Sequence, residues 1–80
     1  MTAKAITPVK SLSLRVLNNN IASAEFKNFN SLMSSAELIK QLAKANYFNL
    51  TENNGNITIY CLDEFQVHKF IEDMLLNKII

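Results

Sequence analysis

The sequence predicts a single α+β domain in which two helices pack on one face of a four-stranded antiparallel sheet. Three observations support this prediction: a pair of strand-like segments surrounds an asparagine-rich turn, a second such pair follows later, and each pair precedes an amphipathic segment. The expected order is therefore strand, strand, helix, strand, strand, helix (ββαββα). Helices that cover one side of such a sheet form a two-layer sandwich and leave the other side open.

The first predicted hairpin lies near the amino terminus. Leu12, Leu14 and Val16 alternate with polar residues, which is typical of a half-buried strand. Asparagines occupy positions 18–20, and asparagine favours turns because it tolerates left-handed backbone angles. Residues 21–26 then provide a second strand, so the two segments are expected to pair antiparallel.

The first helix is predicted from residue 34 to about residue 46. Ser34 and Glu37 have the spacing of a capping box, in which each side chain bonds the backbone N–H of the other residue. The apolar stripe of this helix comprises Leu38, Ile39, Leu42 and Ala45. Lys40 and Lys44 lie on the opposite side, which is expected to face water.

The second hairpin is predicted from residues 47–51 and 57–62. The intervening sequence Asn53-Asn54-Gly55-Asn56 contains the Asn-Gly pair that favours a two-residue hairpin turn. Within the second of these strands, Ile57, Ile59 and Cys61 alternate with residues of the other face.

The second helix is predicted to begin after Asp63, which has the character of an N-cap residue. Gln66 follows three residues later, where it can support the same cap. The expected buried stripe comprises Val67, Phe70, Ile71, Met74, Leu75 and the methylene groups of Lys78.

Residues 11–80 are expected to form this one domain, preceded by a flexible segment at residues 1–10. A chain of 80 residues buries only about 60% of the surface that its unfolded form exposes, so its core is thin. No apolar run is long enough to span a bilayer. The opening residues also lack the apolar centre of a secretory signal, so we expect a cytoplasmic protein.

The charges divide the chain into two halves. Residues 1–48 carry six basic and two acidic side chains, a net charge of +4, whereas residues 49–80 carry two basic and five acidic ones, a net charge of −3. The basic side chains support one of two functions that we consider, a nucleic-acid-binding accessory protein, which is the alternative to the protein-binding function described below. Its candidate phosphate contacts are Lys10, Arg15, Lys27, Lys40 and Lys44, with the sheet tyrosines as stacking groups. The small total charge of +1 argues against it.

Catalytic signals are weak in this sequence. His68 is the only histidine, and no serine or cysteine motif accompanies it as a nucleophile. Cys61 is the only cysteine, which excludes an internal disulfide and a cysteine-only zinc site. We therefore expect a non-enzymatic protein without a cofactor, metal or small-molecule substrate.

The open sheet face is the main candidate for function. It is expected to combine tyrosine, arginine, hydroxyl and aliphatic side chains, a composition typical of protein interfaces. An ordinary solvated sheet face is the competing interpretation, because threonine and tyrosine also favour strands. The candidate protein contacts are Arg15, Tyr47, Tyr60, Leu62, Ile79 and Ile80. The last two form an apolar pair at a chain end that needs to be covered, either by the edge of the protein's own sheet or by a partner.

We therefore expect a small protein that binds another macromolecule, with a protein as the favoured partner. A regulator or inhibitor encoded by a bacterium, phage or mobile element is one concrete form. A homodimer through the open face or an edge strand is also consistent with the small core, which gains from burial against a partner.

Overall fold

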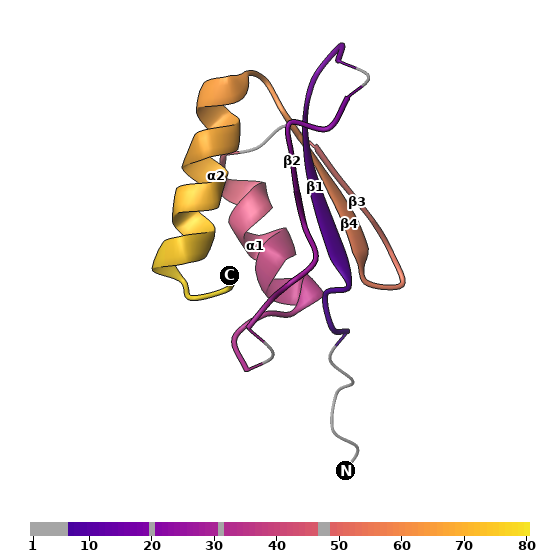
Figure 1. Ribbon diagram of the computed structural model, residues 1–80, viewed down its shortest axis with the longest axis vertical. Helices are drawn as coiled ribbons and strands as arrows, with labels where there is room; N and C mark the ends of the chain where they lie inside the picture. The colour runs from indigo at the N-terminus through magenta and orange to yellow at the C-terminus, as the bar shows by residue number, and fades with distance from the viewer. Residues whose placement is uncertain (1–6, 20, 31, 47–48) are drawn as a thin grey trace.

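The computed structural model describes residues 7–19, 21–30, 32–46 and 49–80, without the side chains of residues 45 and 46. Its elements follow the predicted order and are shown in Figure 1. They are β1 (Ser11–Val16), β2 (Ala24–Phe26), α1 (Ala36–Asn46), β3 (Asn49–Asn53), β4 (Asn56–Cys61) and α2 (Glu64–Leu76).

The sheet is mixed, so the prediction of a purely antiparallel sheet is wrong. Its strands lie in the order β2-β1-β4-β3, and the two outer pairs are the predicted antiparallel hairpins. The central strands β1 and β4 are parallel. Figure 1 shows the reason: α1 carries the chain back to the end of the sheet where β2 began. The second hairpin starts from that end, so β3 runs in the direction of β2 and β4 runs in the direction of β1.

Both helices lie on the same side of the sheet, and this side holds the core (Figure 1). The inward residues of the two central strands are completely or almost completely buried there. The buried apolar core comprises Leu12, Leu14, Ala36, Ile39, Ala43, Ile57, Ile59, Cys61, Val67, Phe70, Met74 and Ile79.

The turn between β3 and β4 confirms the predicted Asn-Gly hairpin. Asn54 and Gly55 have φ angles of 53° and 90°, so both adopt the left-handed conformations that a two-residue type I′ turn requires. Gly55 is buried, and a Cβ atom at this position would overlap the carbonyl oxygen of Pro8. The Gly55 carbonyl also accepts a hydrogen bond from the Lys10 N–H at 2.8 Å, which attaches the turn to the start of β1.

The chain before β1 is held at two places. The Thr7 carbonyl accepts a hydrogen bond from the Ala36 N–H at 3.0 Å, and Val9 packs against the core. These contacts join residues 7–10 to the start of α1 and to the hairpin turn. Residues 1–6 of the predicted flexible segment lie outside the described residues.

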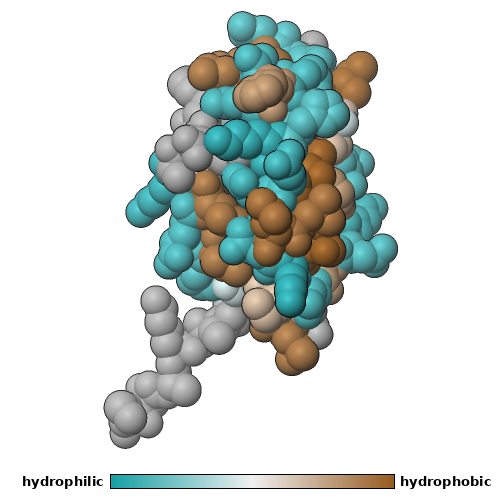
Figure 2. Space-filling model, turned by 90° about the vertical axis from the view of Figure 1, so that its left-hand side faces the viewer, coloured by the Kyte–Doolittle hydropathy of each residue, from teal (hydrophilic) through white to brown (hydrophobic). Residues whose placement is uncertain are grey.

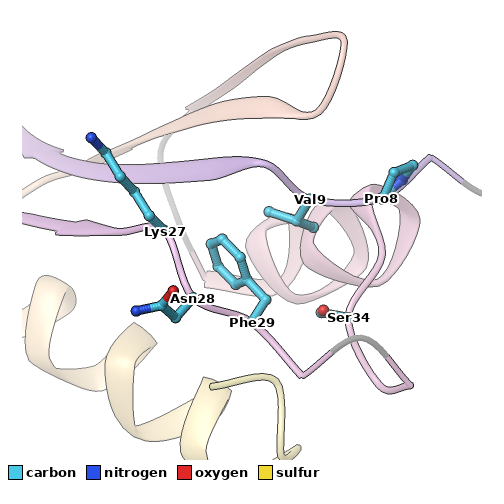
Figure 3. Close-up of a pocket in the computed structure, with 6 residues that line it drawn as sticks. All are labelled: Pro8, Val9, Lys27, Asn28, Phe29 and Ser34. Atoms are coloured by element: carbon cyan, nitrogen blue, oxygen red, sulfur yellow. The ribbon is translucent and has the colours of Figure 1, made fainter.

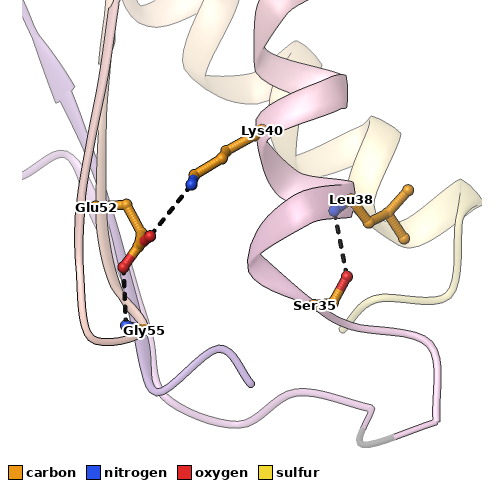
Figure 4. Close-up of polar contacts among 5 residues, drawn as sticks. All are labelled: Ser35, Leu38, Lys40, Glu52 and Gly55. Carbon is orange, nitrogen blue, oxygen red and sulfur yellow. Dashed lines mark hydrogen bonds and ion pairs between the residues drawn. The ribbon is translucent and has the colours of Figure 1, made fainter. Parts of the chain in front are cut away.

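The cap of α1 lies one residue later than predicted. The Ser35 hydroxyl accepts a hydrogen bond from the Leu38 N–H at 3.2 Å, as Figure 4 shows, so Ser35 rather than Ser34 caps the helix. The Ser34 hydroxyl instead donates to the carbonyl of Asn30. Ser34 therefore belongs to the preceding turn, and the capping box with Glu37 does not form.

The cap of α2 confirms the prediction at Asp63. Its carboxylate accepts a hydrogen bond from the Gln66 N–H at 2.9 Å, and the Gln66 side chain accepts one from the Leu62 N–H at 2.7 Å. The buried side of the helix consists of Val67, Phe70 and Met74. Leu75 was expected on this stripe but is exposed, because only a narrow stripe of the helix faces the sheet.

The carboxyl end of α2 turns back into the core. Lys78 has a φ of 59°, and its N–H donates to the Leu75 carbonyl at 3.1 Å. The Ile79 N–H donates to the Met74 carbonyl at 2.9 Å, which completes a Schellman motif. Lys78 is exposed and does not extend the buried stripe, which corrects the prediction, whereas Ile79 is fully buried.

Candidate protein-contact site

The open side of the sheet carries short polar side chains. The strand pairing and the alternation of burial place hydroxyl and amide residues on this side along the whole sheet, together with one acidic, one basic and one phenolic side chain. They are Ser11, Ser13, Arg15, Glu25, Asn49, Thr51, Asn53, Asn56, Thr58 and Tyr60. Within the described part of the chain, both helices lie on the opposite side (Figure 1).

The parallel central strands bring the two most informative of these residues together. Arg15 on β1 is the register partner of Tyr60 on β4, and neighbouring strands lie about 5 Å apart. One step beyond, the Leu17 N–H donates to the Cys61 carbonyl at 2.9 Å, which continues the pairing past the end of β1. Because β1 and β4 are parallel, both strands finish at the same end of the sheet.

Three apolar residues lie at this end of the sheet. Leu62 directly follows β4 and is 57% exposed, and Ile21 in the turn between β1 and β2 is 75% exposed. Leu17 is half-buried without packing against the core. We call the combination of these three residues with Arg15 and Tyr60 the strand-end surface.

Arg15 is held in place by the turn that follows β1. One terminal nitrogen of its guanidinium donates to the Asn19 carbonyl at 3.2 Å, while its Nε is enclosed without a hydrogen-bond partner. Asn18 has a φ of 66°, and the Asn19 side chain accepts from the Ile21 N–H at 3.0 Å. The predicted asparagine turn thus positions both Arg15 and Ile21.

The remaining predicted protein contacts have different outcomes. Tyr47 lies outside the described residues. Ile79 is fully buried in the core because the Schellman motif folds it under the sheet, and Ile80 is half-buried against the same core. The apolar carboxyl end is thus covered largely by the protein's own chain.

The predicted phosphate contacts do not form one surface. Lys10 precedes β1, whereas Arg15 lies near the other end of the same strand and on the open side. Lys40 and Lys44 belong to α1 in the helical layer. The Lys40 ammonium group lies 3.2 Å from the Glu52 carboxylate, which compensates its charge (Figure 4).

A cavity of about 320 Å³ lies near Lys27, and no sequence pattern predicts it because three separate segments line it. The lining residues are Pro8, Val9, Lys27, Asn28, Phe29 and Ser34 (Figure 3). In Figure 3 the Lys27 side chain extends across β1, away from the Phe29 ring and Ser34. The polar groups that line the cavity therefore do not converge on one point, as a catalytic site requires.

Cys61 and His68 occupy contrasting environments. Cys61 is fully buried on the inward side of β4, and burial, together with the charges of Asp63 and Glu64, raises the pKa of its thiol to about 11. Such a thiol is a poor nucleophile at neutral pH. His68 is exposed on α2. Among the described residues, no group of three or more histidine, cysteine or acidic side chains could hold a metal ion.

Comparison with known proteins gave no match: no family model, curated protein or solved structure resembles this chain significantly. None of the helices described in the structure has both the length and the apolar character needed to cross a bilayer.

Proposed function

We propose that this protein acts without catalysis by binding another protein, as a small regulator or inhibitor of bacterial, phage or mobile-element origin. The strand-end surface is the proposed contact site. The observation that carries this proposal is the pairing of Arg15 with Tyr60 near the end of the sheet that also carries the exposed residues Leu62 and Ile21. Arginine and tyrosine are enriched among the residues that dominate binding energy at protein interfaces, and exposed aliphatic side chains add apolar area that a partner can bury.

The surface also has the construction of a preformed site. Its two central residues lie on paired strands, so a partner does not need to order them on binding. The hydrogen bond from the Ser23 hydroxyl to the Glu64 carboxylate, 2.9 Å long, joins the chain before β2 to the start of α2. This contact stabilises the end of the sheet at which the strand-end surface lies.

Protein binding fits the distribution of charge better than nucleic-acid binding. Phosphate-driven binding needs several basic side chains along one path, whereas here Arg15 lies on the open side of the sheet and Lys40 and Lys44 lie in the helical layer. One of them, Lys40, is already paired with Glu52. A nucleic-acid partner therefore becomes the alternative that the experiment must distinguish.

Affinity capture from a native lysate, with and without nuclease, tests the proposal. We expect recovery of a specific protein that resists nuclease. Leu62→Ser should weaken its binding at least about tenfold, which corresponds to about 1.4 kcal/mol. Leu32→Ser, at another highly exposed leucine, is the matched control and should bind as the wild type does.

A second pair of variants tests the basic residue. Arg15→Ala should reduce binding, whereas Lys44→Ala, on α1, should not. The proposal fails if recovery depends on nucleic acid, if affinity falls steeply with salt in the manner of phosphate contacts, or if both control variants weaken binding as much as the test variants do.

A further inference from the structure

The outer face of α2 carries four exposed residues in a regular order: Phe65, Lys69, Glu72 and Leu76. They are separated by four, three and four residues, so they line one side of the helix. Phe65 is 77% exposed and Leu76 is 74% exposed. This side points away from the buried residues of the same helix.

No other described element covers this face, because all four of its side chains are exposed. In Figure 1, α2 forms the outer side of the helical layer. Figure 2 views the molecule from that side, where apolar side chains occur in the upper part and in the middle, with polar side chains between them.

The order apolar, basic, acidic, apolar is complementary to itself when reversed. If a second copy of α2 lies antiparallel, with a two-fold axis between positions 70 and 71, Phe65 of one copy meets Leu76 of the other. Lys69 then meets Glu72, and the symmetry repeats both contacts. The spacing also matches the layers of an antiparallel coiled coil, in which successive seam residues face each other.

We propose that two copies of this protein associate through α2 in this antiparallel, two-fold arrangement. Such an interface is isologous, because the same surface is used on both copies. A parallel arrangement is disfavoured, since it would place Lys69 against Lys69 and Glu72 against Glu72. Leu75 is exposed beside Leu76 and extends the apolar contact made by the Phe65 ring of the second copy.

A second copy is favoured over an unrelated partner by charge and spacing together. An arbitrary ligand would need a matching sequence of apolar and charged groups, whereas an antiparallel copy of α2 supplies that sequence in register. The helix has 13 residues and is about 20 Å long, so the contact is small and the dimer is weak and concentration-dependent. The residues of the strand-end surface take no part, so both surfaces can be tested independently.

Sedimentation equilibrium over about 5 to 500 µM measures this association directly. We expect the wild type to shift from monomer to dimer within this range. Phe65→Ser should abolish the shift, because it removes both apolar contacts of the symmetric interface. Leu32→Ser is the control, since this exposed leucine lies outside α2, and it should dimerise as the wild type does.

Charge reversal tests the proposed register. Lys69→Glu and Glu72→Lys should each weaken self-association at least about fivefold, because each creates two like-charge contacts across the two-fold axis. Equimolar mixing of the two single variants should restore association as a heterodimer, since every contact is then between opposite charges. The double variant K69E/E72K should again form a homodimer.

Three results would overturn the proposal. One is a wild type that remains monomeric up to about 500 µM. Another is a dimer that Phe65→Ser leaves intact but Leu62→Ser disrupts, because association would then occur through the open side. The third is a mixture of the two charge variants that associates no better than either alone. Circular dichroism of each variant confirms that these exposed substitutions leave the fold intact.

Discussion

The carboxylate of Glu52 on β3 lies 3.2 Å from the ammonium group of Lys40 on α1 (Figure 4). Its second oxygen accepts a hydrogen bond from the Gly55 N–H at 3.1 Å. One side chain therefore joins the helical layer, the edge strand and the hairpin turn.

These contacts predict a pH-dependent contribution to stability. The hydrogen bond from Gly55 and the nearby Lys40 lower the pKa of Glu52 below its usual value of 4.5. A lowered pKa in the folded state stabilises the fold above pH 4.5, and this contribution is lost as the pH falls through the lowered pKa. The free energy of unfolding of Glu52→Gln should therefore differ from that of the wild type more at pH 7 than at about pH 2.5.

Urea denaturation at several pH values measures this difference. Glu25→Gln, at an exposed position of the edge strand β2, is the control, and its difference from the wild type should not depend on pH. An equal difference between Glu52→Gln and the wild type at all pH values would contradict the role of the Glu52 charge.

Gly55→Ala should destabilise the protein by at least about 2 kcal/mol. The residue has a φ of 90°, and an added Cβ atom would overlap the Pro8 carbonyl oxygen. Asn54→Gly is the matched control in the same turn, and it should be tolerated because glycine adopts left-handed angles readily. Chemical denaturation of both variants checks the prediction, which fails if the alanine variant is as stable as the wild type.

Lys78→Gly should increase the free energy of unfolding by about 1 kcal/mol. Lys78 adopts a left-handed φ of 59° at the end of α2, where glycine avoids the steric cost of a Cβ atom. Lys69→Gly provides a control of opposite sign: in the interior of the same helix it should destabilise by about 1 kcal/mol. Thermal and urea unfolding distinguish these outcomes, and a destabilised Lys78→Gly variant would contradict the Schellman motif.

The free energy of unfolding should fall at high pH, where the buried thiol of Cys61 ionises. Burial raises the pKa of its thiol from the usual 9.0 to about 11, so the neutral thiol stabilises the folded state below pH 9. This contribution is lost as the pH rises through about 11. The stability of Cys61→Ala should fall less than that of the wild type between these values.

Thiol labelling of the native protein provides an independent measurement for Cys61. At neutral pH we expect labelling to be slow and to accelerate strongly in denaturing urea, because the side chain is fully buried. Rapid labelling of the native protein would show that β4 opens readily at this position.

Local patterns predicted the local parts of the fold. The Asn-Gly pair specified the hairpin turn at Asn54 and Gly55, and Asp63 marked the start of α2, because each signal depends only on neighbouring residues. The cap of α1 was misplaced by one residue, since two consecutive serines fit the cap equally well. Only the turn around Asn30 assigns the hydroxyl of Ser34 to another acceptor.

The candidate site was predicted in its composition but not in its geometry. Alternation correctly placed Arg15 and Tyr60 on the open side. Their direct pairing depends on the parallel contact between β1 and β4, which brings together residues 45 positions apart and leaves no local sequence signal. The sequence left open whether the protein's own chain or a partner covers Ile79, because a left-handed lysine at Lys78 is an uncommon way to end a helix.

Site-specific photo-crosslinking tests the strand-end surface most directly. A photoreactive amino acid at position 62, with the same group at position 32 as the control, is irradiated in the native lysate after nuclease treatment. We predict a discrete protein adduct from position 62 and none from position 32. Adducts of equal yield from both positions, or no protein adduct from position 62, would contradict the proposed binding function of this surface.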